Sequence, residues 1–245
     1  MCAAQISLSS SPSPRDCGRF SVSAIIATMF RASKLYLLFY NLLQCLGWSL
    51  ALVSLLRVLF TTLSVRGAYA AAGDLICFLQ SVSFLEVVHS ALGLIRSGVV
   101  LTLLQATGRI HFLLSIVRQI VEVQGHHAVF ITLMAWSISE VIRYSHYTST
   151  ILGICPSWLT YLRYTAFIVL YPIGVAPGEM WLMYRALPYI KEKNLYSSFF
   201  SKAFISYHTF VLVVLMLYPV LWLKLYLHLF EQRRLKLGRH RTKQS

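Results

Sequence analysis

A tyrosine and a glutamate lie eight residues apart in the segment Tyr171–Glu179, which reads YPIGVAPGE. The segment lies within an apolar run, yet it contains two prolines and two glycines, which a helix built only to span a membrane would avoid. A carboxylate can remove a proton from a substrate, and a phenol can donate one to a leaving group. The two residue types therefore suit acid–base chemistry, provided that the chain turns both toward the same side.

Other ionisable side chains also fall within apolar runs, although the whole chain has only 8 Asp and Glu residues. An ionisable group in hydrocarbon costs at least about 2.5 kcal/mol, so we expect these side chains to face the interior of a helix bundle and to find partners there. They are Asp74, Glu86, Arg109, Glu140, Arg143, Arg163 and Glu179.

Two pairs of polar residues are spaced by three, which places each pair on one face of a helix. Glu140 and Arg143 in WSISEVIRYSHY are predicted to form a salt bridge, with lining of a pocket as the alternative. Glu86 and His89 in LEVVHSALGLIRS are predicted to form a hydrogen-bonded pair with a neutral histidine. No further ligands of suitable spacing share that face, so we expect no metal and assign Glu86, His89 and Glu140 to a structural polar core.

The elements that must position these residues are membrane helices, because 57% of the residues are hydrophobic and the apolar runs are as long as a bilayer requires. The sequence therefore predicts an all-α, polytopic membrane bundle of about six transmembrane helices, the fifth interrupted by proline and glycine. The six runs are Tyr36–Val58, Tyr69–Ile95, Val99–Val117, Ala128–Thr148, Leu159–Leu187 and Tyr207–Phe230.

The net charge of +14 does not indicate a nucleic-acid partner, because the basic residues lie mostly at the ends of the apolar runs and in the tail. Membrane topology and anionic lipid headgroups explain that distribution. The basic tail, residues 233–245, is predicted to be cytosolic, and six spans place the N-terminus on the same side. Residues 1–30 are predicted to be a disordered or targeting extension, followed by a six-helix transmembrane domain over residues 31–232.

The stretch HSALGLIR, His89–Arg96, partly matches the HCxxGxxR pattern of cysteine-dependent phosphatases. That chemistry requires a thiolate nucleophile at the second position. Here the second position is Ser90, a hydroxyl without an evident base. We therefore do not expect phosphatase activity.

Several stretches together resemble the very-long-chain (3R)-3-hydroxyacyl-CoA dehydratase family, also called protein-tyrosine-phosphatase-like. They are SKLYLLFYNLLQCLGW, LEVVHSALGLIRS, WSISEVIRYSHY, WLTYLRYTAFIVLYPIGVAPGE and the basic tail, in order from Ser33 to Arg234. The stretch GEMWLMYRALPYIKEKNLY resembles the plant branch of the family. The resemblance covers nearly the whole chain.

The resemblance implies an enzyme of the endoplasmic-reticulum membrane with both termini in the cytosol. It would dehydrate very-long-chain (3R)-3-hydroxyacyl-CoA to trans-2-enoyl-CoA, next to the other enzymes of the fatty acid elongation cycle. The reaction requires no cofactor and no metal, but it does require a base, an acid and a group that holds the thioester oxygen. A YPxGxxxE pattern supplies the catalytic pair of the family, which implies Tyr171 and Glu179.

The coenzyme A part of such a substrate carries phosphates, which guanidinium groups bind well. Arg143, Arg163 and Arg185 are the candidates, and Arg163 has the alternative role of an anchor at a helix end. The roles of the catalytic pair stay open: Glu179 is the base and Tyr171 the acid, or a protonated Glu179 is the acid and Tyr171 binds the thioester oxygen.

This chain departs from the family pattern, because Glu179 lies one residue later than YPxGxxxE requires. Seven residues of α-helix leave a pair about 20° apart around the axis, whereas eight residues leave it about 80° apart. We expect a local bulge at Pro177 and Gly178 to absorb the extra residue and restore the facing geometry. If the pair does not meet, the second hypothesis applies: a catalytically weak or inactive dehydratase-like scaffold that binds elongation or signalling partners.

Overall fold

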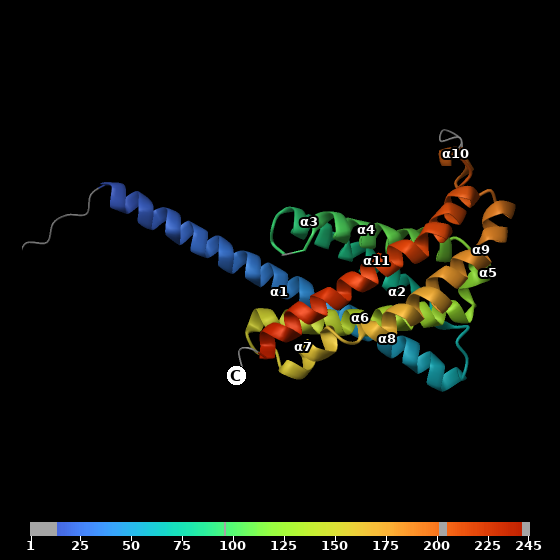
Figure 1. The fold of residues 1–245 in the computed structure, drawn as a ribbon, viewed down its shortest axis with the longest axis horizontal. Helices are drawn as coiled ribbons and strands as arrows, with labels where there is room; N and C mark the ends of the chain where they lie inside the picture. Colours follow the sequence, from blue (N-terminus) through green and yellow to red (C-terminus); the bar gives the residue numbers. More distant parts are fainter. Residues whose placement is uncertain (1–13, 96, 201–204, 242–245) are drawn as a thin grey trace, which may run out of the picture. The chain divides into compact units, whose positions relative to one another are not determined.

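The computed structural model describes residues 14–95, 97–200 and 205–241, and within these ranges every regular element is a helix (Figure 1). The all-α fold class is therefore confirmed. The outermost parts of the predicted extension and tail, residues 1–13 and 242–245, lie outside the described residues. The helices are α1 (Pro14–Thr62), α2 (Ala68–Ser83), α3 (Leu85–Ala91), α4 (Val99–Ile110), the π-helix η1 (His111–Val117), α5 (Val121–Gln124), α6 (His127–Leu152), α7 (Ser157–Arg163), α8 (Phe167–Ile173), the π-helix η2 (Gly174–Met180), α9 (Trp181–Glu192), α10 (Ser197–Phe200) and α11 (Tyr207–Arg241).

The chain divides into two units after Tyr40. The described part of the first unit is the beginning of α1, which starts at Pro14. Proline is favourable at the first position of a helix, because the N–H that it lacks would have no partner within the helix. The helix therefore begins within the stretch that the sequence assigned to a disordered or targeting extension, and the boundary at residue 30 stays a prediction. The second unit starts at Asn41 and contains the remaining elements.

Within the described residues, five helical stretches are long and apolar enough to cross a membrane, and they match five of the six predicted runs. They are Arg31–Thr62, Ala68–Ala91, Val99–Val117, Ser157–Glu192 and Tyr207–Leu237. The remaining predicted run is α6, whose 26 residues extend over about 39 Å, more than the hydrocarbon core of about 30 Å. Its buried side chains include Thr132, Ser137, Glu140 and Thr148, which explains its lower hydropathy.

Helix α6 is the central helix of the second unit, where it contacts α2, α7, α8, η2 and α9 (Figure 1). The part of α1 that belongs to this unit is fixed to its neighbours by polar contacts. Gln44 donates a hydrogen bond to the carbonyl of Leu79 in α2 (3.3 Å), and the Cys45 sulfur lies 3.2 Å from the Ser145 hydroxyl in α6. The neighbours of α6 thus cover it on several sides, which allows its polar side chains to be buried.

Both ends of α6 are defined by the residues that flank it. At the start, Nδ1 of His126 accepts a hydrogen bond from the backbone N–H of Ala128 (3.2 Å), as an N-cap side chain does. At the end, Gly153 adopts a left-handed conformation with φ of 74°, and Pro156 follows three residues later. Glycine is favoured at this position because a side chain would be strained there.

The cap at His126 makes the stability of the protein depend on pH. Desolvation lowers the pKa of His126, and the nearby His127 and Arg185 lower it further. A lowered pKa in the folded state means that the unfolded chain binds more protons. The contribution of His126 is therefore complete above its unfolded pKa of about 6.5 and is lost as the pH falls through the folded pKa.

We expect the unfolding temperature in detergent to drop between about pH 7.5 and pH 5.5, and the His126→Asn variant to show a smaller drop. Asparagine keeps a hydrogen-bond acceptor at the cap but does not titrate. Thermal unfolding of both proteins across this range measures the difference. The same drop in both proteins would show that another group is responsible.

Candidate active site

The segment that carries Tyr171 and Glu179 is a helical run with a π-helix in its middle. Helix α8, the π-helix η2 and helix α9 follow one another without a break from Phe167 to Glu192. A π-helix forms hydrogen bonds from residue i to i+5, so each of its turns holds more residues than a turn of α-helix. Pro177 and Gly178 both lie within η2, which confirms the predicted bulge.

Gly178 allows η2 to approach α6 closely. A Cβ atom at this position would lie 2.4 Å from Oγ1 of Thr132, which is far too close. Thr132 is completely buried, and its hydroxyl donates a hydrogen bond to the carbonyl of Ala128 (2.9 Å), so it has little freedom to move away. The glycine therefore lets the backbone of η2 lie against α6, which brings the neighbouring Glu179 to that helix.

We expect Gly178→Ala to destabilise the protein by about 1–3 kcal/mol, because the new methyl group overpacks the contact with Thr132. The loss is measured by thermal unfolding in detergent. Gly108→Ala in α4 is the control, since a Cβ there meets nothing within 4 Å, and we expect it to leave stability unchanged or to raise it. The double variant Gly178→Ala/Thr132→Ala should recover part of the loss; no recovery would argue against this contact.

Glu179 is buried between two other helices, with 5% of its surface exposed. Nε1 of Trp136 in α6 donates a hydrogen bond to its Oε1 atom (2.8 Å), and the hydroxyl of Tyr218 in α11 donates to its Oε2 atom. An indole N–H can only donate. Both carboxylate oxygens therefore act as acceptors, each toward a different helix.

Tyr171 lies against the same helix, α11. Its ring stacks on Trp222 (6.3 Å between centroids) and on Tyr226 (5.9 Å). Trp222 and Tyr226 follow Tyr218 at intervals of four residues, so the three lie on one face of α11. Because Glu179 contacts Tyr218 on this face, Tyr171 and Glu179 are both turned toward it, as the bulge predicts. Among the described residues, the two side chains share no hydrogen bond with each other.

An ion-pair network joins α3, α4 and α6. Arg143 donates to Oε2 of Glu86 and to Oε2 of Glu140, both at 2.5 Å, and Arg109 pairs with Oε1 of Glu140. The hydroxyl of Tyr144 donates a second hydrogen bond to Glu86. The predicted Glu140–Arg143 salt bridge is thus present, and it belongs to a larger cluster. Each charge lies beside one of opposite sign, which lowers the cost of burial.

Arg109 connects this network to Glu179. Its guanidinium lies 4.7 Å from the centre of the Trp136 ring, and Trp136 is the hydrogen-bond donor to Glu179. Arg109 is also close enough to Glu179 and to Tyr171 for direct electrostatic interaction. The sequence had shown Arg109 as a charge in the middle of an apolar run. It gave no signal for Trp136 or Tyr218, since neither has a local spacing that relates it to Glu179.

The predictions for His89 and Asp74 have other outcomes than those for Glu140 and Arg143. His89 is buried in α3 and lies within electrostatic range of Glu86, while the predicted hydrogen bond between them stays a prediction. The expectation that Asp74 faces the interior of the bundle is wrong, because its side chain is 84% exposed and pairs with Arg118 at 3.8 Å. Asp74 lies in the second turn of α2, where a partner at the end of η1 is accessible at the surface.

The three arginines proposed for coenzyme A lie in two places. The guanidinium groups of Arg143 and Arg163 both lie near the ring of Tyr147, at 5.9 Å and 5.7 Å from its centre. Nη2 of Arg163 also donates to the hydroxyl of Tyr147 (3.4 Å). Arg185 follows Arg163 by 22 residues in the helical stretch Ser157–Glu192, with the whole of α8 and η2 between them. The structure therefore brings Arg143 and Arg163 together and leaves Arg185 near the other end.

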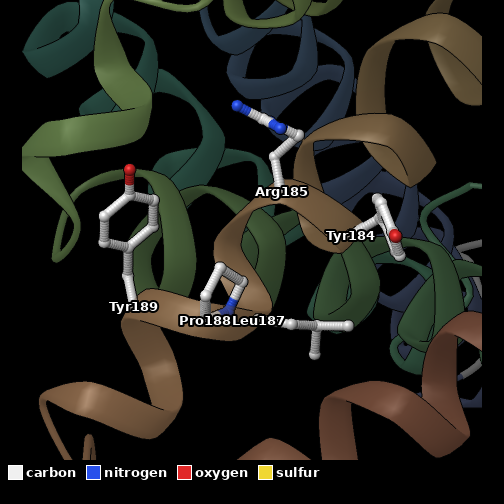
Figure 2. Close-up of a pocket in the computed structure, with 5 residues that line it drawn as sticks. All are labelled: Tyr184, Arg185, Leu187, Pro188 and Tyr189. Carbon is white, nitrogen blue, oxygen red and sulfur yellow. The ribbon is translucent and has the colours of Figure 1, made fainter.

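Arg185 is exposed on α9 and lines a pocket there. Figure 2 shows the pocket and its lining residues, which all belong to this one helix: Tyr184, Arg185, Leu187, Pro188 and Tyr189. Neither catalytic candidate lies among them. We therefore do not place the reaction in this pocket.

Comparisons with known proteins show which family the chain resembles. A family model described as "Protein tyrosine phosphatase-like protein, PTPLA" matches residues 80–239. The mouse protein named very-long-chain (3R)-3-hydroxyacyl-CoA dehydratase 2 is 36% identical over 202 residues, covering 81% of this chain and 79% of the mouse protein. The human protein of the same name is 35% identical over 202 residues, which cover 81% of this chain and 79% of the human protein.

A plant relative is also similar. The rice protein named very-long-chain (3R)-3-hydroxyacyl-CoA dehydratase PASTICCINO 2A is 39% identical over 167 residues, which cover 66% of this chain and 73% of the rice protein. No solved structure gave a significant match to the chain.

Proposed function

Because the chain belongs to the protein tyrosine phosphatase-like PTPLA family, we propose that it dehydrates very-long-chain (3R)-3-hydroxyacyl-CoA to trans-2-enoyl-CoA in fatty acid elongation. This activity makes it a hydro-lyase. The observation that carries the proposal is the position of Glu179, which is buried between Trp136 and Tyr218 and turned toward the same face of α11 as Tyr171. An acid and a base on one side of an apolar bundle are what the elimination of water requires.

Glu179 suits the role of the base. Both of its oxygens accept hydrogen bonds, and such donors stabilise the ionised carboxylate. In the proposed reaction, Glu179 removes a proton from the α-carbon of the thioester. The electrons of that C–H bond form the new double bond, and the bond between C3 and its hydroxyl oxygen breaks.

Tyr171 suits the role of the acid. Among the described residues, no protein group forms a hydrogen bond with its hydroxyl, whereas stacking on Trp222 and Tyr226 fixes its ring. Tyr171 donates its proton to the departing hydroxyl, which leaves as water. The proton held by Glu179 then returns to the tyrosinate, so both residues recover their starting states and no external reagent is consumed.

We place the coenzyme A end of the substrate near Arg163. Phe230 of α11 packs edge-on against Phe167, which follows Arg163 by four residues, with 5.1 Å between ring centroids. The C-terminal part of α11 therefore lies at the same end of the bundle as α7, the helix that ends at Arg163 (Figure 1). That part carries the basic residues Lys224, Arg233, Arg234 and Lys236. Phosphates are attracted to such a positive end, whereas Arg185 is too far away to contribute.

The positively charged end of the bundle also supports an orientation of the chain in the membrane. Basic residues beside a span favour the cytosol, so we place the C-terminus there, and six spans place the N-terminus on the same side. We place the protein in the endoplasmic-reticulum membrane, as the family resemblance implies. In this orientation, cytosolic acyl-CoA can reach Arg163. Other enzymes of the elongation cycle are the proposed partners, because one of them must supply the 3-hydroxyacyl-CoA and another must consume the enoyl-CoA. The π-helix η2, which contains the extra residue before Glu179, supports the active enzyme over the inactive scaffold.

The activity is tested with the purified protein in detergent and a long-chain (3R)-3-hydroxyacyl-CoA, with formation of the enoyl-CoA followed by mass spectrometry. We expect turnover of this substrate and much slower turnover of the (3S) enantiomer, whose hydroxyl is directed away from Tyr171 when the α-proton faces Glu179. An inactive protein would favour the scaffold.

A further inference from the structure

Helix α11 contributes a polar side chain to the site that the sequence did not indicate. The hydroxyl of Tyr218 donates to one oxygen of Glu179, while Trp136 donates to the other at 2.8 Å. Trp136 belongs to α6 and Tyr218 to α11, so the carboxylate is held between two helices. Glu179 itself belongs to η2, a third element.

We propose that Tyr218 is a positioning residue that holds the carboxylate of Glu179 in the orientation required of the base, an inference that rests on the proposed function. A glutamate side chain has three rotatable bonds, and a base works only within hydrogen-bond reach of the proton that it removes. A single donor at Oε1 leaves the carboxylate free to rotate about that contact. A second donor at Oε2, from a different helix, fixes the plane of the group.

A merely structural role for the Tyr218 hydroxyl would be to attach α11 to the bundle, and the chain offers a matched control for this alternative. Tyr207 lies on the same helix and is almost completely buried, with 4% of its surface exposed. Its hydroxyl lies 3.0 Å from Nε2 of His111 and donates to the carbonyl of Ser115. Tyr207→Phe therefore removes an attachment of α11 that does not involve Glu179.

The test measures kcat and KM of the wild type, Tyr218→Phe, Tyr207→Phe and Trp136→Phe with the (3R)-3-hydroxyacyl-CoA substrate, together with their unfolding temperatures. We expect kcat of Tyr218→Phe to fall about 10- to 100-fold, the effect of losing a hydrogen bond to a charged group, with KM unchanged within about twofold. Trp136→Phe loses the other donor and should show the same pattern. Tyr207→Phe should keep kcat even where its unfolding temperature falls.

The outcomes distinguish the inference from the activity on which it depends. If the wild type is active and Tyr218→Phe keeps its kcat, the inference is wrong and the dehydratase assignment stands. An increase in KM with unchanged kcat also overturns the inference, because Tyr218 then binds substrate instead of positioning the base. The inference equally fails if Tyr207→Phe and Tyr218→Phe lose activity alike, in proportion to stability. A wild type without turnover overturns the proposed function and this inference with it.

Discussion

Glu179→Gln should reduce kcat by about 10²- to 10⁴-fold, the range for loss of a general base. Glutamine has nearly the same size as glutamate, and its amide oxygen can still accept the hydrogen bond from Trp136, so the surrounding structure should persist. The amide cannot take up a proton from the α-carbon, so the chemical step is lost. Single-turnover experiments with excess enzyme measure this loss, because they remain sensitive when steady-state rates are too slow.

The control for this variant is Glu122→Gln. Glu122 is an exposed carboxylate at the start of α5 that pairs with Lys193 at 2.8 Å. Removing its charge should leave kcat within about twofold of the wild type, since an exposed ion pair contributes little. If Glu179→Gln retained more than about a tenth of the activity, another group would have to be the base.

Tyr171→Phe should reduce kcat by about 10²- to 10³-fold with little change in stability. The phenylalanine ring can keep the stacking on Trp222 and Tyr226, so the change removes the proton donor and little else. The control is Tyr184→Phe, which removes the hydroxyl of an exposed tyrosine on α9 and should leave activity unchanged. Comparison of kcat and KM for the two variants measures the effect.

A substrate with a different leaving group separates the two roles proposed for Tyr171. Chloride leaves without being protonated, so a 3-chloroacyl-CoA has no need of an acid. If Tyr171 is the acid, the defect of Tyr171→Phe should largely disappear with this substrate. If Tyr171 holds the thioester oxygen instead, the defect should be the same with both substrates, because both reactions develop charge on that oxygen.

The sequence predicted those parts of the site that depend on local spacing. Glu140 and Arg143 form the expected salt bridge because residues three apart share a helix face. The extra residue before Glu179 and the adjacent Pro177–Gly178 pair predicted a bulge, and η2 occupies that position. Apolar runs of bilayer length matched the helices closely, since length and hydropathy alone decide whether a segment can cross a membrane.

The parts that the sequence did not predict depend on packing between helices. Trp136 and Tyr218 lie 43 and 39 residues from Glu179, and no local pattern relates residues at such distances. The partner of Arg109 is likewise on another helix, 31 residues away. The prediction that Asp74 faces the bundle interior was wrong for a different reason. Membership of an apolar run does not say which face of the helix a residue occupies. Such residues become visible only once the helices are placed together.

The central claim is that Tyr171 and Glu179 act on one substrate across the π-helix η2, and a double-mutant cycle tests it most directly. Turnover of the (3R)-3-hydroxyacyl-CoA is measured for the wild type, Tyr171→Phe, Glu179→Gln and the double variant in one assay. If the residues act as a unit, the double variant should be no slower than Glu179→Gln within about threefold, because losing either one already disables the step. If the two losses multiply in the double variant, or if both single variants keep the wild-type rate, the claim is wrong.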